Sequence, residues 1–389
     1  MKGKKTMKTR MKSLVSILTA GIMSTALLAG CSSGTSSSSS TSSTDSSSTT
    51  AGTTTASQAE SGAESDASSA AETPTVSDEL ITVYGVIDPQ ISAQQIIADK
   101  MGYYEEFGLN VKNEFLSQGG DMASYIASGT AQVSFETSYT TTPAKASGVG
   151  VKMLATVNNI GATQAVIAAK DSGIVTPKDM EGKKIGMGAG SGVLIAIQKC
   201  CEEFGVDFDS IEFVTIGPSD QLAAMENGSI DMMACWEPWV SNAQTDLGGY
   251  LLFTGTHCYF EGNDKDVPWL NFYTTFQVTD EFLASHPAEC EALLKAYAKA
   301  TDYINSNMSD AAAIIAEQLN LEADQVLGIM QKNVYDMAWT DDFKEATDSI
   351  AQNQLDNGNI EFIPEFSDYA DPTPLKNACP ELFRATNIG

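Results

Sequence analysis

The chain has 389 residues and a formal net charge of −28, with 50 acidic against 22 basic residues. A chain with this much negative charge repels phosphate backbones. Nucleic acid is therefore excluded as a partner. Two histidines and seven cysteines without zinc-site or disulfide-scaffold spacing indicate neither a metal site nor a cofactor.

The first thirty residues have the layout of a secretory signal. Basic residues precede a short apolar stretch over 14–28 that is rich in small residues. The stretch ends Leu28-Ala29-Gly30-Cys31, which resembles the bacterial lipobox, whose cysteine is diacylated and begins the mature protein. Residues 1–30 are therefore predicted to be a lipoprotein signal peptide, with lipidation at Cys31. An ordinary signal with a chance cysteine is the alternative.

Residues 31–78 are rich in Ser and Thr and hold almost no large apolar side chains. Such a segment cannot offset its ordering entropy by burial. We expect a disordered tether that holds a domain off the membrane, where two acyl chains anchor stably. The predicted location is the cell membrane, lipid-anchored on the extracellular face of a Gram-positive cell. Loss of the signal's six basic residues leaves a charge of −34.

Strands and helices alternate from residue 81 onward, by hydrophobic period and glycine stops. In the first unit we expect strands over 81–87, 111–115, 131–136 and 151–157, and helices over 91–107, 121–129 and 140–146. The second unit has strands over 165–170, 183–188, 211–217 and 230–236, and helices over 193–204 and 219–227. A strand over 270–278 and a helical C-terminal third, with one helix opened by Pro287, complete the chain.

This alternation implies an α/β fold with mainly parallel sheets and helices on both faces. Crossings near 158–164 and 256–269 divide the chain into two lobes with a cleft between them. Lobe 1 is predicted to comprise 79–158 and 256–389, and lobe 2 to comprise 159–255. Ligands of such sheets bind outside the carboxyl ends of the strands.

Two stretches, 102–157 and 183–239, resemble the substrate-binding proteins of ABC importers for aliphatic sulfonates, taurine and nitrate. That family also includes binders of thiamine-pyrimidine precursors. The resemblance implies a type II periplasmic-binding-protein-like fold with two βα lobes, a central cleft and a helical C-terminal part. It also implies a monomer that delivers a small organic anion or zwitterion, such as a sulfonate or taurine, to permease and ATPase subunits. A pyrimidine precursor or another neutral solute is the alternative ligand.

Arg384 is the only arginine after the signal. A bidentate arginine clamp, the usual device for carboxylates and phosphates, is therefore nearly excluded from the cleft. The glycine-rich stretch 188–192 joins a strand to a helix, and its backbone N–H groups can face an anion. We therefore expect Gly190, Ser191 and Gly192 to bind ligand. A dinucleotide fingerprint is disfavoured because Ser191 replaces its third glycine, and a plain turn remains open.

In the first lobe, polar residues follow the strands and can line the cleft. Amides, a hydroxyl and a glycine supply neutral contacts, and two acids supply negative charge, although each residue could also serve a turn or a cap. The two acids suggest a ligand that carries an amine as well as an acceptor. The predicted set is Asp88, Gln90, Gln118, Gly119, Glu136, Ser138 and Asn158.

Trp236 and Glu237 follow the strand over 230–236. Trp236 is predicted to wall the cleft and Trp239 to pack inside, with core packing of both as the alternative. Glu237 is placed in the ligand set, although a charge at a helix N-terminus without a ligand role is the favoured interpretation of this residue taken alone.

No Gly-x-Ser-x-Gly motif surrounds Ser191, and His257 and His286 are isolated. The chain is therefore not expected to be an enzyme; an exported surface hydrolase is the competing class, and a structural adhesin is disfavoured by the βα pattern. The six cysteines beyond Cys31 are expected to be free buried thiols, with a bridge such as Cys258–Cys290 left open.

Overall fold

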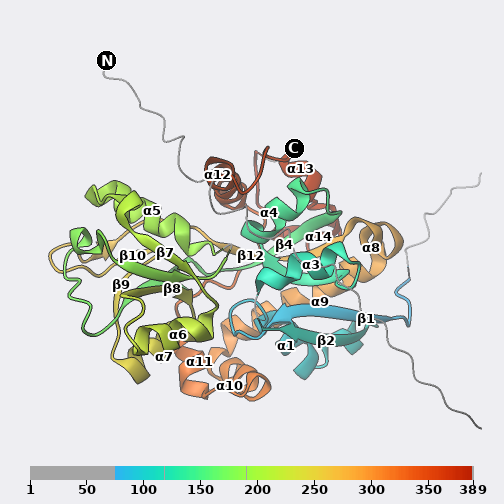
Figure 1. Ribbon diagram of the computed structural model, residues 1–389. Helices are drawn as coiled ribbons and strands as arrows, with labels where there is room; N and C mark the ends of the chain where they lie inside the picture. The colour runs from blue at the N-terminus through green and yellow to red at the C-terminus, as the bar shows by residue number, and fades with distance from the viewer. Residues whose placement is uncertain (1–74, 118, 190, 388–389) are drawn as a thin grey trace, which may run out of the picture. The chain divides into compact units, whose positions relative to one another are not determined.

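The computed structural model describes residues 75–117, 119–189 and 191–387. The predicted signal, the lipidation site Cys31 and most of the tether lie outside these ranges, as do Gln118 and Gly190. The described chain is built on two β-sheets, each packed against helices (Figure 1).

The first sheet has five strands. In spatial order they are β2 (Asn110–Leu116), β1 (Leu80–Val86), β3 (Val133–Thr137), β12 (Tyr273–Thr279) and β4 (Val151–Asn159). β1 runs parallel to β2 and β3, so the carboxyl ends of these three strands meet at one edge.

The second sheet has seven strands. In spatial order they are β11 (Lys265–Asp266), β10 (His257–Cys258), β9 (Tyr250–Thr254), β5 (Gln164–Ala168), β8 (Met232–Trp236), β6 (Lys184–Met187) and β7 (Glu212–Thr215). Here β6 runs parallel to β7 and β8.

The expectation of mainly parallel sheets is wrong. β12 is antiparallel to both β3 and β4, and β5 is antiparallel to both β8 and β9. These are the strands that enter a sheet directly from the other one. A right-handed crossover within one sheet imposes parallel pairing, and a strand that arrives from outside is free of that constraint.

The first crossing between the sheets lies between β4 and β5. The second occurs later than the predicted boundary at residue 256, because β10 and β11 still belong to the second sheet and the first sheet resumes only at Tyr273. Strands of two residues carry no hydrophobic period, so the pattern could not reveal them.

Helices of the first unit pack on the first sheet. They are α1 (Ala93–Lys100), α2 (Tyr103–Glu106), α3 (Met122–Ala127) and α4 (Ser138–Ala146). The single helix expected over 91–107 is thus two helices, broken at Gly102, which has a φ of 70°. Asp121 precedes α3 but makes no side-chain cap.

Helices cover both faces of the second sheet (Figure 1). On one side lies α5 (Val193–Phe204), which has the predicted bounds and ends at the left-handed Gly205. On the other side lie α6 (Pro218–Glu226) and α7 (Trp239–Leu247), where Met225 and Val240 share a cluster with Met233 of β8.

The C-terminal third is helical, as predicted, and Pro287 is the first residue of its longest helix. Residues of α9, α10 and α14 join the core over the first sheet, together with Trp339. The helices are α8 (Asp280–Ser285), α9 (Pro287–Ser306), α10 (Met308–Leu319), α11 (Ala323–Met330), α12 (Asp341–Asp356), α13 (Phe366–Tyr369) and α14 (Thr373–Ala378).

The folded part begins slightly before the predicted tether end at residue 78. Val76 packs against the first core, and the Ser77 N–H donates to Glu289 Oε1 at 2.8 Å. All six described cysteines are free and buried, as expected, and Cys258 and Cys290 lie in different clusters. None of the helices in the described ranges is long and apolar enough to cross a membrane.

Candidate functional site

Asp88 lies just beyond β1 and is almost fully buried. Its Oδ1 accepts the N–H groups of Gln90 (2.8 Å) and Ile91 (2.7 Å), which holds the turn into α1. Burial raises the pKa of this carboxyl group to about 7, against the lowering effect of the two N–H donors, and the charge of Glu136 adds to the increase. Asp88 therefore stabilises a turn and also places a buried carboxyl group at the carboxyl end of β1.

Glu136 is also buried, near the end of β3. Its Oε1 accepts three bonds, from the Thr137 N–H (3.0 Å), the Thr137 hydroxyl (3.3 Å) and the Thr140 hydroxyl (2.9 Å). Its Oε2 is buried and has no partner in the part of the chain that the structure describes. Burial raises the pKa of Glu136 to about 6.

Gly119 is held against this carboxylate. A Cβ at position 119 would lie 2.6 Å from Glu136 Oε2, closer than any real contact allows. Because β2 and β3 flank β1, the segment after β2 and the end of β3 meet across the end of β1. The structure thus brings Asp88, Gly119 and Glu136 together, as the strand pattern predicted.

Gln90 and Asn158 join elements rather than present free amides. The Asn158 Nδ2 donates to the Gln90 carbonyl, and its Oδ1 accepts from Thr274 of β12. The Gln90 Nε2 donates to the Glu237 carbonyl at 3.0 Å, and its Oε1 accepts from Thr163. Gln90 therefore links the first sheet to the second.

Glu237 is 1% exposed, between β8 and α7. Its Oε2 accepts the Ser241 N–H at 2.9 Å, so the interpretation as a helix N-terminal charge is confirmed. Its Oε1 pairs with Lys332 Nζ at 2.8 Å. The sequence reasoning missed Lys332, because nothing in the pattern relates a loop after α11 to the end of β8.

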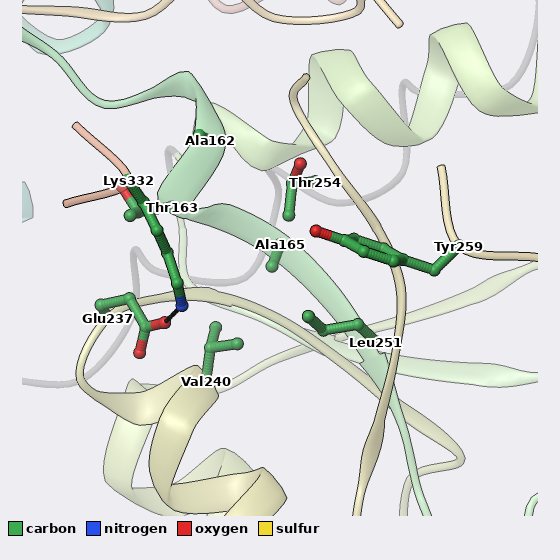
Figure 2. Close-up of a pocket in the computed structure, with 9 residues that line it drawn as sticks. All are labelled: Ala162, Thr163, Ala165, Glu237, Val240, Leu251, Thr254, Tyr259 and Lys332. Atoms are coloured by element: carbon green, nitrogen blue, oxygen red, sulfur yellow. Dashed lines mark hydrogen bonds and ion pairs between the residues drawn. The ribbon is translucent and has the colours of Figure 1, made fainter. Parts of the chain in front are cut away.

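A small cavity lies beside this ion pair. Figure 2 shows Lys332 reaching toward Glu237, with Val240, Leu251 and Tyr259 lining the same space. Its volume is about 30 Å³, which suits ordered water and is too small for an organic solute. The cavity is therefore part of the link between elements and is not the solute site.

Trp236 and Trp239 are both half-buried, and both pack against the cluster formed by β8, α6 and α7. The division into a cleft-lining Trp236 and a packing Trp239 therefore stays a prediction.

The helix α5 packs on the second sheet, and its N-terminus holds two of the predicted ligand-binding residues. Ser191 is buried, and its Oγ has no partner among the described residues. Gly192 is the N-cap of α5, and a Cβ there would lie 2.5 Å from the ring of Phe272. Position 192 requires glycine because the Phe272 ring lies so close to the backbone there. The preceding residue, Ser191, places a hydroxyl without a partner among the described residues at the N-terminus of α5, where the helix dipole is positive.

The N-terminus of α4 has a matching feature. Ser138 is its first residue, is buried, and has an Oγ without a partner in the described chain. The next residue, Tyr139, places its ring 6.2 Å from that of Phe272. Phe272 therefore contacts helix N-termini from both sheets. It had been expected only as part of a strand.

The histidines serve elsewhere. The two ring nitrogens of His257 bond to Asp266 (2.7 Å) and Asp264 (2.9 Å), and these bonds raise its pKa. His286 stacks on Phe282 with ring centroids 4.6 Å apart. Within the described ranges no group of three or more His, Cys, Asp or Glu side chains could hold a metal ion.

Residues 91–311, more than half of the chain, match the family model described as NMT1/THI5 like. The chain belongs to this family. The family resemblance predicted from 102–157 and 183–239 is confirmed.

Among its relatives, a putative aliphatic sulfonates-binding protein of Bacillus subtilis is 24% identical over 292 residues, which cover 74% of this chain and 85% of that protein. A 4-amino-5-hydroxymethyl-2-methylpyrimidine phosphate synthase of Schizosaccharomyces pombe is 28% identical over 221 residues, covering 53% and 59%.

Among solved structures, the periplasmic aliphatic sulphonate binding protein SsuA from Escherichia coli superposes with a TM-score of 0.63 at 16% identity. The match covers 75% of this chain and 92% of SsuA. At this identity the likeness shows the fold, and it confirms the predicted type II periplasmic-binding-protein architecture.

Proposed function

We propose that the protein is the solute-binding component of an ABC importer. It captures a small organic anion or zwitterion, such as an aliphatic sulfonate or taurine, and delivers it to the permease. The observation that carries the proposal is a pair of buried hydroxyls, Ser138 Oγ and Ser191 Oγ, that have no hydrogen-bond partner among the described residues. Ser138 lies at the N-terminus of α4, which packs on the first sheet, and Ser191 lies at the N-terminus of α5, which packs on the second. The residues that follow them, Tyr139 and Gly192, both contact Phe272.

An acidic group of the solute would lie at the N-terminus of α5. Its Ser191 hydroxyl and the helix dipole favour negative charge without an arginine. The one arginine after the predicted signal, Arg384, pairs with Asp336 at 3.1 Å on the surface. The rings of Tyr139 and Phe272 would contact the apolar part, as in most small-molecule sites.

Capture would proceed by closure of the two lobes. Gln90 and the Glu237–Lys332 pair join elements of both sheets, so they would be made and broken as the lobes close and open. Binding would then shift an equilibrium between the two arrangements. The remaining predicted residues, including Trp236, would contribute to the walls of this cleft.

The setting of the protein is proposed from the sequence. Lipidation of Cys31 would anchor a monomer to the outer face of a Gram-positive membrane, next to its permease and ATPase subunits. A relative named as a putative aliphatic sulfonates-binding protein supports the solute class.

A pyrimidine precursor is the second candidate. Glu136 Oε2 is a buried acceptor that an aminopyrimidine could satisfy, and one relative is named as a pyrimidine phosphate synthase. The isolation of both histidines from the strand ends disfavours the hydrolase alternative.

A thermal-shift screen tests the proposal. Mature protein would be heated with taurine, alkanesulfonates, nitrate, carboxylates and aminopyrimidines. A ligand at a hundred times its dissociation constant adds about 2.7 kcal/mol to the free energy of unfolding, which is readily measured. Stabilisation with recovery of unchanged solute supports a binding protein. Chemical conversion of the solute, or no shift with any member of the panel, contradicts it.

A further inference from the structure

Glu136 points to the chemistry of the solute, on the basis of the proposed function. We propose that the bound solute presents an N–H donor, an ammonium or amino group, to Glu136 Oε2. The site would then select aminated solutes over bare anions.

The two oxygens of Glu136 are in opposite situations. Oε1 takes three donors from the β3–α4 junction, whereas Oε2 takes none from the described chain although it is buried. An unpaired buried acceptor costs about 1–3 kcal/mol, and more when it is charged. A solute donor would remove this cost, so the orphan atom favours a solute that can donate.

Gly119 lies directly against this atom. Only a residue without a Cβ can lie so close to Oε2, since an added carbon would be 2.6 Å away. The carboxylate thus faces the segment that follows β2, at the edge where parallel strands of an α/β sheet present their ligands. The orphan oxygen therefore lies where a solute is expected.

The local charge favours a cation. Asp88 lies just beyond the end of β1, the strand between β2 and β3. It adds a second buried carboxyl group, and its charge interacts with that of Glu136. No lysine, arginine or histidine of the described ranges forms an ion pair with either acid. An ammonium group would supply the missing counter-charge, whereas a bare sulfonate or nitrate at this position would be repelled.

A zwitterion would use both ends of the site. Its amine would meet Glu136 in the first lobe, and its acid would meet the Ser191 hydroxyl at the N-terminus of α5 in the second. Aminopyrimidines would use the same acceptor without an acid. The shared chemistry is the N–H donor, and matched probes separate the two sources.

The experiment is calorimetric titration of mature protein with two matched pairs, taurine against ethanesulfonate and 4-aminopyrimidine against pyrimidine. Each pair differs only in the amino group. We expect the amino member of at least one pair to bind tenfold or more tightly than its partner. Glu136→Gln should reduce that preference tenfold, and the exposed Glu226→Gln on α6 should leave it unchanged.

Gly119→Ala provides a second variant, because its methyl group would crowd Oε2 without altering the charge. It should also reduce the preference for the amino member. A merely structural role of Glu136 would weaken both members of a pair equally, and that result would overturn the inference. If the amine-free member binds as tightly as or more tightly than its amino partner in every pair that binds, the inference is overturned and the proposed function stands. Failure of all four probes to bind would count against the proposed function itself, and the inference would fail with it.

Discussion

The buried carboxyl group of Glu136 predicts a pH dependence of stability that can be isolated by one substitution. Burial raises its pKa from 4.5 to about 6 in the folded protein, and each pH unit is worth about 1.4 kcal/mol. The folded state therefore keeps the proton at pH values where the unfolded chain has released it. As a result, the free energy of unfolding falls as the pH rises from about 4.5 to about 6, by about 2 kcal/mol from this group.

Asp88 acts in the same direction, with a folded pKa of about 7. Exposed acids act in the opposite direction, because hydrogen bonds lower the pKa of Asp179 and Asp341. The total pH profile therefore mixes both signs. The difference between the natural protein and Glu136→Gln removes the shared contributions.

The assay is urea unfolding of both proteins without solute, at pH values from 4 to 8. Relative to the natural protein, Glu136→Gln should become more stable by about 2 kcal/mol between pH 4 and pH 8. The same comparison with Glu226→Gln, whose side chain is exposed, is the matched control. A flat difference for Glu136→Gln would show that the carboxyl group is solvated in the folded protein, and would refute the reasoning from its burial.

Four further substitutions test other parts of the structure. Lys332→Met removes the cation that pairs with the buried Glu237. It should lower the free energy of unfolding, measured in urea, by about 1–2 kcal/mol, a modest loss because the lysine is partly exposed. No change would show that the ion pair does not stabilise the protein. Trp236→Ala should weaken solute binding about tenfold or more in a titration, while Trp239→Ala mainly lowers the melting temperature, and equal binding loss without loss of stability in both would contradict that division. Gly192→Ala should lower the melting temperature by the equivalent of about 1–3 kcal/mol, because the ring packed over it has no room for a methyl group; a neutral result would mean that the ring moves aside.

The local sequence pattern predicted the bounds of an element where those bounds depend on residues inside it or next to it. α5 has the bounds that its apolar period and Gly205 predicted, and α9 begins at Pro287. The strand ends were also placed well enough to bring Asp88 and Glu136 to one edge. These features depend on neighbours in the sequence, so the sequence reveals them.

Features that depend on distant partners were not predictable. The direction of β5 and β12 follows from where the chain crosses between the sheets. The short strands β10 and β11 extend the sheet sideways beyond β9, and they form only because β10 pairs with β9 and β11 pairs with β10. Likewise, no pattern could indicate that Lys332 would pair with Glu237, because 95 residues separate them.

The same distinction applies to the site. Its chemical inventory, two acids and several hydroxyls and amides with almost no arginine, was determined by the sequence alone. Only the tertiary structure decided which groups are already used. Gln90 and Asn158 bond to protein atoms, while Glu136 Oε2, Ser138 Oγ and Ser191 Oγ have no partner in the part of the chain that the structure describes. The reason is physical: a side chain's type sets what it can bond, and whether a bond is left for a solute depends on what the rest of the fold places beside it.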